Sequence, residues 1–341
     1  MGDDMVLVID GNSLVHRSFH ALAGSTASEQ QPAWAVRGLL GQLVAAVDRI
    51  RATRVIVGFD DPHSSLRRER WPQYKANRAE KLPTLVEQLL AAVETMRALG
   101  LAVVVPQGLE ADDVLASVAA QARASQSRAV IVTSDRDAFS LIDDTTSVLR
   151  IINGGVDASP LLTPERLVTL LGVRPEQYRD YAALRGDASD NLPGVNGIGP
   201  KTAARLLATF GTAAAAFDDL DVVQQALGVG VARRLAEDGA RAAWELNHLV
   251  MAQHCDVPIQ DEGGALPLPV GPVAEVFRAH NLTWSAAQAT RVLCDAEIEV
   301  SRPPRQEPAW NPDHARTYRS TPRRETVAKV AATVSPQLAL F

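Results

Sequence analysis

Acidic residues recur where short apolar runs of the sequence end. Asp10 closes the run VLVID, Asp60 closes VIVGFD, and Asp135 closes VIVTSD. Carboxylate oxygens are hard ligands that suit Mg²⁺ or Mn²⁺, and crowded like charges raise one another's pKa unless a cation offsets them. Asp also caps ordinary loops and helices, which explains one such position but not the whole series. We therefore expect a divalent-metal site with these ligands: Asp10, Asp60, Glu110, Asp112, Asp113, Asp135, Asp137, Asp187 and Asp190.

The apolar runs themselves indicate the elements that position these acids. Runs rich in Val and Ile predict buried strands over 5–9, 54–59, 101–105 and 129–133, with a shorter strand over 147–152. Helical spacing of apolar residues lies between them, over 36–50, 82–99 and 111–123. This alternation predicts an α/β domain with a mostly parallel sheet flanked by helices. The carboxyl ends of such strands share one edge, where ligands bind.

From Thr163 onward the strand pattern stops and Ala- and Leu-rich helical segments follow. We expect a catalytic α/β domain over 1–172, a helical domain over 173–298, and a tail over 299–341. From Ser301 the tail holds seven bases, three acids and six prolines, a composition typical of disorder.

Composition bounds the class of protein. The 341 residues are 46% hydrophobic and 22% charged, which fits about two globular domains. No apolar run reaches about 18 residues and no signal peptide is visible, so we expect a cytoplasmic protein without a membrane segment. The formal net charge of −6 argues weakly against a nucleic-acid partner when taken alone.

Two segments nevertheless have the composition of phosphate binders. Residues 67–81, RRERWPQYKANRAEK, interleave bases with aromatic residues, as single-stranded nucleic acid requires. Lys75 and Arg78 are expected on one face of a helix there. Residues 194–207, GVNGIGPKTAARLL, allow a tight glycine turn before a helix start at Lys201. His16 and His20 have a spacing that zinc ligands also use, but no Glu follows His16, so we favour a structural role.

Five blocks in order carry a family resemblance: VIDGNSLVHRSFHAL, FDD to YKANR, GLEADDVLA, VTSDRDAFSLI and RGDASDNLPGVNGIGPKTAARLL. The chain resembles the 5′-nuclease family, and within it the 5′→3′ exonuclease domain of bacterial DNA polymerase I, with flap endonucleases as wider relatives. The resemblance covers most of residues 5–210. It implies a PIN-like sheet, a helical arch over about 63–90, and a helix–three-turn–helix element that holds duplex DNA.

The resemblance also implies roles for residues. It implies two divalent cations held by the nine acids, with Asp10, Asp60, Glu110 and Asp112 at the tighter site and the later aspartates at the second. It implies catalytic contacts from Arg17, Lys75 and Arg78 to the scissile phosphate. Expected DNA contacts are Tyr74, Arg67, Arg68, Gly197, Gly199 and Lys201, with K⁺ bound in the helix–three-turn–helix element. The expected substrates are DNA with 5′ flaps, nicks or 5′ ends, and RNA primers, in Okazaki fragment processing and DNA repair.

The chain holds no segment long enough for polymerase I's further domains, so we expect a free-standing, monomeric, nucleoid-associated nuclease. Its last residues, QLALF, resemble the peptide with which bacterial replication proteins bind the sliding clamp, through Gln337, Leu338, Leu340 and Phe341. Two other readings stay open. A PIN-like ribonuclease would share the acidic edge without needing the GIGPK turn, and a DNA-binding scaffold would not need the acids.

Overall fold

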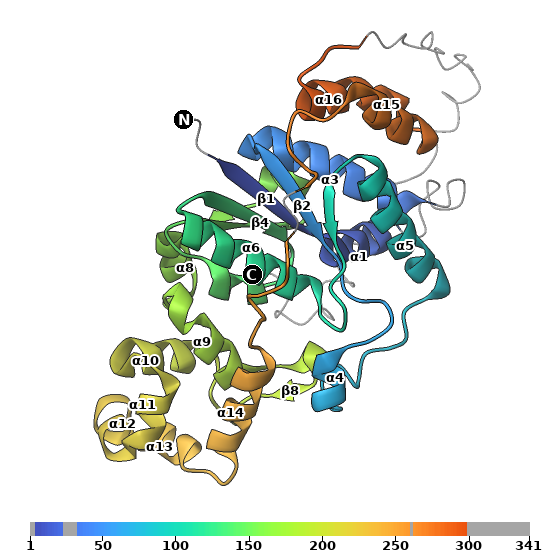
Figure 1. The fold of residues 1–341 in the computed structure, drawn as a ribbon. Coiled ribbons are helices and arrows are strands. Elements are labelled where there is room, and N and C mark those ends of the chain that lie inside the picture. Colours follow the sequence, from blue (N-terminus) through green and yellow to red (C-terminus); the bar gives the residue numbers. More distant parts are fainter. Residues whose placement is uncertain (1–3, 23–32, 260–261, 299–341) are drawn as a thin grey trace, which may run out of the picture. The chain divides into compact units, whose positions relative to one another are not determined.

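A computed structural model describes residues 4–22, 33–259 and 262–298 (Figure 1). Its centre is a six-stranded sheet in the order β3-β2-β1-β4-β5-β6. The first five strands are parallel and β6 is antiparallel to β5. This confirms the mostly parallel α/β sheet. The strands are β1 (Met5–Asp10), β2 (Arg54–Gly58), β3 (Ala102–Val104), β4 (Arg128–Thr133), β5 (Thr146–Arg150) and β6 (Leu161–Leu162).

Alternation along the strands supplies a core on each face of the sheet. Leu7 and Ile9 of β1 point into one hydrophobic cluster, whereas Val8 between them points into the other. All three side chains are fully buried. Because successive strand residues face opposite sides, a parallel sheet needs apolar residues at every position, which is why these strands read as continuous Val and Ile runs.

Helices cover both faces. The Leu7 face packs against α1 (Gly11–Leu22), α3 (Trp34–Ile50) and α5 (Pro83–Ala98), and the Val8 face packs against α6 (Ala111–Ser125). The expected helices over 36–50, 82–99 and 111–123 are thereby confirmed. No helix in the described ranges is both long and apolar enough to cross a membrane.

A helical region follows the sheet and shares the core on the Val8 face. Its short helices are α8 (Pro164–Leu171), α9 (Tyr178–Arg185), α10 (Pro200–Phe210), α11 (Ala213–Asp218), α12 (Leu220–Leu227), α13 (Val229–Leu235) and α14 (Ala240–Val250). The one-turn helix α7 (Gly155–Ala158) lies before β6 and packs on the Leu7 face instead. Thr163 caps α8 with its side chain, directly before Pro164, as its sequence predicts.

The last helices differ from the expected grouping of 173–298 as one helical domain. The helices α15 (Val270–Ala279) and α16 (Thr283–Cys294) belong to the cluster on the Leu7 face, with α3 and α5. Val273, Phe277 and Leu293 are fully buried there. Helical periodicity shows that a face is apolar but not which surface covers it, so the sequence did not reveal this return to the sheet.

The segment expected as a helical arch is also mostly not helical. Between β2 and α5 the segment holds only the short helix α4 (Leu66–Arg70). Residues 72–77 then form turns, and 78–82 are not helical. Pro72 explains the end of α4, because the residue before a proline is driven from helical to extended geometry. Trp71 has φ −128° and ψ 84° accordingly. Lys75 has a positive φ of 56°, so it and Arg78 do not share a helix face.

A tight two-stranded hairpin follows α9 within the helical region and carries acids of the expected site. Its strands are β7 (Gly186–Asp187) and β8 (Leu192–Pro193). Gly186 has φ 71° and ψ 173°, a conformation open almost only to glycine. A Cβ on Gly186 would lie 2.2 Å from the backbone N of Gly194. The hairpin that holds Asp187 therefore depends on the missing side chain.

We predict that Gly186→Ala lowers the free energy of unfolding by more than about 2 kcal/mol, because it combines backbone strain with a backbone clash. Gly41→Ala is the matched control: Gly41 lies in the interior of α3 with open space around it, and Ala should raise stability by about 0.5–1 kcal/mol. Urea titration measures both. Equal stabilities of the two variants would contradict the role given to the hairpin.

Candidate active site

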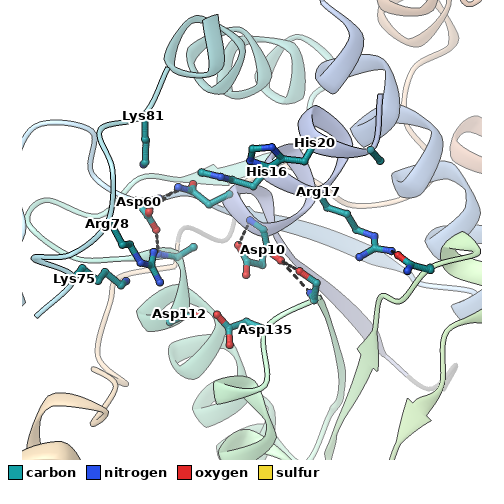
Figure 2. Close-up of a pocket in the computed structure, with 16 residues that line it drawn as sticks. Asp10, His16, Arg17, His20, Asp60, Lys75, Arg78, Lys81, Asp112 and Asp135 are labelled. Atoms are coloured by element: carbon teal, nitrogen blue, oxygen red, sulfur yellow. Dashed lines mark hydrogen bonds between the residues drawn. The ribbon is translucent and has the colours of Figure 1, made fainter. Parts of the chain in front are cut away.

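A cavity of about 580 Å³ opens at the carboxyl edge of the sheet (Figure 2). Asp10 at the end of β1, Asp60 after β2, Asp112 at the start of α6 and Asp135 after β4 all line it. The parallel strands deliver these carboxylates to one place, as the sequence predicts. Basic and imidazole side chains complete the lining: His16, Arg17, His20, Lys75, Arg78 and Lys81.

Hydrogen bonds fix the orientation of Asp10 and Asp60. The backbone N–H of Ser13 donates to Asp10 Oδ1 at 2.8 Å, and Thr133 Oγ1 donates to Asp10 Oδ2 at 2.7 Å. Asn12 grips Asp60 twice: its Nδ2 donates to Asp60 Oδ2 at 2.6 Å, and its Oδ1 accepts from the Asp60 backbone N–H at 3.0 Å. These partners hold the carboxylates in fixed positions, as a preorganised ligand set requires.

Burial and mutual repulsion raise the pKa of Asp10 and Asp112. Burial raises the pKa of Asp10 to about 7, with Asp60 and Asp135 adding to the effect and hydrogen bonds opposing it. Burial, with Asp135 and Asp10 nearby, raises the pKa of Asp112 well above its ordinary value. The site therefore concentrates negative charge that a cation would stabilise.

A second acidic group lies beside the first. The carboxylates of Asp137, Asp187 and Asp190 each bring an oxygen within 4.8 Å of the others. Asp137 begins the short helix η1 (Asp137–Leu141), Asp187 ends β7, and Asp190 ends η3 (Ala188–Asp190). Burial and the neighbouring Asp135 raise the pKa of Asp137 to about 8. An all-carboxylate donor set at this spacing fits a hard divalent cation.

Two of the expected metal ligands, Glu110 and Asp113, do not line the cavity and are held by basic side chains instead. Asp113 is fully buried and forms a two-pronged ion pair with Arg67, at 2.6 and 2.8 Å. Burial opposes its charge, but Arg67 outweighs burial and holds the pKa of Asp113 below its ordinary value. Glu110 accepts hydrogen bonds from Lys75 Nζ at 2.8 Å and from Tyr74 Oη at 3.1 Å. Helix geometry is the reason, since successive residues of α6 point in different directions.

Arg67 was expected to contact DNA, and the structure contradicts this, because its side chain is only 6% exposed. Besides Asp113, it donates to the backbone oxygens of Val250 at 3.3 Å and Ala252 at 2.8 Å. It therefore joins α4, α6 and the chain leaving α14. Tyr74 differs likewise: burial raises its pKa, so it keeps its proton, and it is too covered to stack on a base. Arg68 lies exposed on α4.

Lys75 and Arg78 face the acids from the turn segment (Figure 2). Burial opposes charge on Lys75, yet Glu110 raises its pKa overall, so it stays protonated. Arg78 pairs with Asp190 and donates through Nε to the backbone oxygen of Ser189 at 3.2 Å. The backbone N–H of Lys75 also donates to the Asp190 oxygen at 2.9 Å. The turn segment is thus fastened to the hairpin of the helical region.

The structure adds residues that sequence reasoning missed. Lys81, Asn12 and Asn153 line the cavity although none of them was expected there. Arg17, which was expected to contact the phosphate, also lines the cavity and donates to Asn153 Oδ1 at 3.0 Å. His16 and His20 also line it, with ring centroids 6.4 Å apart, rather than packing in the core. Burial lowers the pKa of His16 to about 4, so its ring is neutral near pH 7. Asn12 lies two residues after Asp10 in the sequence. A single sequence does not show whether such an asparagine forms a turn or hydrogen-bonds a carboxylate, so its contact with Asp60 was not predicted.

The remaining expected contacts lie in the glycine-rich turn and the tail. Gly197 has a positive φ of 74°, Gly199 precedes α10, and Lys201 is exposed in its first turn. The expected clamp-binding residues Gln337, Leu338, Leu340 and Phe341 lie outside the described residues.

The fold and site together define a class: a parallel-sheet protein with an acidic edge and a basic rim, followed by a helical region. Residues 5–172 match the family model of the 5'-3' exonuclease N-terminal resolvase-like domain, and residues 173–268 match that of its C-terminal SAM fold. The chain therefore belongs to the 5'-3' exonuclease family, a family of nucleases.

Known relatives agree. The chain is 37% identical over 299 residues to DNA polymerase I of Mycobacterium tuberculosis H37Rv, covering 87% of this chain and 31% of the polymerase. It is 39% identical over 241 residues to the thermostable DNA polymerase I of Thermus aquaticus, covering 71% of this chain and 28% of the polymerase. It thus spans about a third of the length of these relatives.

Solved structures share the fold. T5 5'-exonuclease with bound zinc ions superposes with a TM-score of 0.59 at 19% identity, over 85% of this chain and 99% of that one. The catalytic core of Rad2 in complex with DNA superposes with a TM-score of 0.55 at 13% identity, over 86% and 92%.

The adjacent acids Asp112 and Asp113 should respond oppositely to neutralisation. Asp113→Asn removes the two-pronged partner of buried Arg67 and leaves it only Glu110 as an anion, at 3.2 Å, so it should cost about 3 kcal/mol of unfolding free energy. Asp112→Asn removes a carboxylate repelled by Asp10 and Asp135, so stability without divalent ions should rise. Urea unfolding at pH 7 in a chelator measures both. An Asp113→Asn protein as stable as the parent chain would contradict the assignment.

Proposed function

We propose that the protein is a divalent-metal-dependent 5′→3′ exonuclease and flap endonuclease that hydrolyses DNA phosphodiesters at 5′ ends and flaps. The observation that carries this proposal is that a group of carboxylates and a group of basic side chains line the same cavity. Acids from four strand or helix ends face Lys75, Arg78 and Lys81 across it. Such a site is complementary to a phosphate bound through cations on one side and bases on the other.

The carboxylates divide into two ligand groups for two divalent cations. Asp10, Asp60, Asp112 and Asp135 would hold one, and Asp137, Asp187 and Asp190 the other. When bound, such cations polarise a phosphoryl oxygen and lower the pKa of water. The choice of Mg²⁺ or Mn²⁺ stays a prediction. Glu110 and Asp113 act indirectly in this scheme, by positioning Lys75 and Arg67.

The basic residues supply the phosphate contacts. Lys75 and Arg78 would offset negative charge that builds on the scissile phosphate, exchanging their present partners Glu110 and Asp190 for it. Arg17, at the opposite side of the cavity, would orient the same phosphate or its neighbour. These bonds need no helix, so the turn geometry of the segment is compatible with the role.

The helical region would hold the duplex. Lys201 in the first turn of α10 adds a cation where backbone amides already favour an anion, and the preceding turn with Gly197 and Gly199 allows close approach of a DNA backbone. Exposed Arg68 would add a further contact. Binding of K⁺ at the glycine turn, cleavage of RNA primers and a monomeric state stay predictions.

We predict that Asp135→Asn abolishes Mg²⁺-dependent cleavage of a 5′-flap DNA while leaving the fold intact, because it removes a ligand that no core packing requires. Asp144→Asn is the control, since Asp144 is exposed in a loop away from the cavity. Gel analysis on flap, nicked and single-stranded substrates, each as DNA and RNA, measures the effect. Undiminished cleavage by Asp135→Asn would contradict the metal assignment, and a preference for RNA flaps would favour a ribonuclease.

Flap removal would give the enzyme a role in DNA replication and repair, provided that it is brought to replicated DNA. It would then act in the cytoplasm, at the nucleoid. We propose the sliding clamp as the partner and QLALF as the peptide that binds it, because a short apolar end on a Pro-rich basic linker suits a tether. This segment lies outside the described residues.

Deletion of residues 337–341 should therefore abolish co-elution with a bacterial sliding clamp. It should leave flap cleavage on DNA alone unchanged, because none of the cavity residues is removed. A scrambled terminal pentapeptide of the same composition is the matched control and should behave like the deletion. Unchanged co-elution would exclude the peptide without touching the nuclease proposal.

A further inference from the structure

Three arginines to which the proposed chemistry gives no role lie beside the acidic site: Arg136, Arg150 and Arg185. Arg150 ends β5, where it pairs in register with Thr133 of β4. Arg136 follows β4 in the loop to η1, and Arg185 is the last residue of α9. Phe139 lies beside both Arg136 and Arg150: its backbone N–H donates to the Arg136 backbone oxygen at 2.9 Å, and its ring contacts the Arg150 guanidinium.

A buried aromatic cluster supports the guanidinium groups. The rings of Phe139 and Tyr178 lie 5.3 Å apart, and those of Tyr178 and Tyr181 lie 5.8 Å apart. Arg150 sits 5.9 Å from the Phe139 ring centre, and Arg185 sits 5.0 Å from that of Tyr181. Cation–π contacts of this kind hold a guanidinium in place through its face and leave its N–H groups free to donate.

In the described part of the chain, no carboxylate contacts the guanidinium groups of these three arginines. Over residues 4–22, 33–259 and 262–298, no carboxylate forms an ion pair with Arg136, Arg150 or Arg185, and none of their guanidinium groups makes a hydrogen bond. The Nε atom of Arg150 is buried without a partner. By contrast, Arg67, Arg78 and Arg123 each pair with a carboxylate. Arg150 and Arg185 are partly buried and Arg136 is exposed. A partly buried cation without a partner is costly unless an anion binds it.

We propose that Arg136, Arg150 and Arg185 form a second phosphate site, which binds a backbone phosphate of duplex DNA other than the one being cleaved. The inference rests on the proposed nuclease function and extends it. Arg150 ends β5 and Arg185 ends α9, whereas Lys75 and Arg78 reach the acids from the segment between β2 and β3. A strand passing the acids would meet bases on both sides of them.

The chemistry favours the DNA backbone over an unpaired base. Phe139, Tyr178 and Tyr181 are 1–3% exposed, so no ring is free to stack on a base. Guanidinium groups bind phosphate oxygens through paired N–H donors, and such contacts fix register without reading sequence. The site should therefore act on duplex affinity, and do so equally for different sequences.

The test measures binding of the full chain to a fluorescent 5′-flap duplex over a range of salt concentrations, in an Asp135→Asn background. Arg150→Gln and Arg185→Gln should each weaken binding about three- to tenfold. Each should also reduce the slope of log K against log salt by about 0.9, the value for one lost phosphate contact. Arg150→Lys retains the charge and should restore most of the affinity.

Arg123→Gln is the matched control: Arg123 lies at the far end of α6, paired with Asp143, and its loss should leave binding unchanged. With Asp135 restored, the Gln variants should raise KM and leave kcat nearly as it was. If the parent chain cleaves the flap but both Gln variants bind with unchanged affinity and slope, the second phosphate site is wrong. If the parent chain neither binds nor cleaves DNA, the proposed function itself fails. Should Arg150→Gln not fold, the more accessible Arg185→Gln and Arg136→Gln give the same two readouts.

Discussion

Repulsion among carboxylates at one edge of the sheet is the constraint on which the rest of this structure depends. Parallel strands bring their carboxyl ends together, so acids placed there cannot avoid one another. The chain answers in two ways. Where the acids must stay anionic ligands, neutral donors from Asn12, Ser13 and Thr133 fix their positions without removing their charge. Where an acid serves the fold instead, a cation neutralises it, as Arg67 does for Asp113.

Arg67 determines which acids of the segment 110–113 serve the fold and which one lines the cavity. Glu110, Asp112 and Asp113 are near neighbours in sequence, yet only Asp112 lines the cavity. Arg67 on α4 pairs with Asp113 on α6 and donates to the backbone oxygen of Ala252, just after α14. It therefore links α4 and α6 to the end of α14. A buried ion pair adds little net stability in general. Here its value is geometric, because it sets which carboxylate of the motif is free to bind a ligand.

The sheet and the main acids could be predicted because they follow from periodic signals. Continuous Val and Ile runs mark doubly buried strands, and an acid after each run must lie at the common edge. Individual side-chain directions could not be predicted. Arg67, Tyr74 and Arg68 look equally suited to DNA in a basic, aromatic segment, but packing buries the first two and leaves the third exposed. The return of α15 and α16 to the sheet, and the unpaired arginines around Phe139, depend on contacts between residues far apart in sequence.

Net charge is a poor guide to the ligand of such a protein, and the reason is physical. Charges separated by more than about 8–10 Å are largely screened in physiological salt, so a DNA strand responds to the groups beside each phosphate and not to the sum of −6. Near the cavity, the acids lie between the bases of the turn segment on one side and Arg136, Arg150 and Arg185 on the other. Cations bound to the acids would make that whole strip attractive to phosphate. Without them, the acids would repel the strand that the arginines attract, so metal binding and DNA binding should reinforce each other.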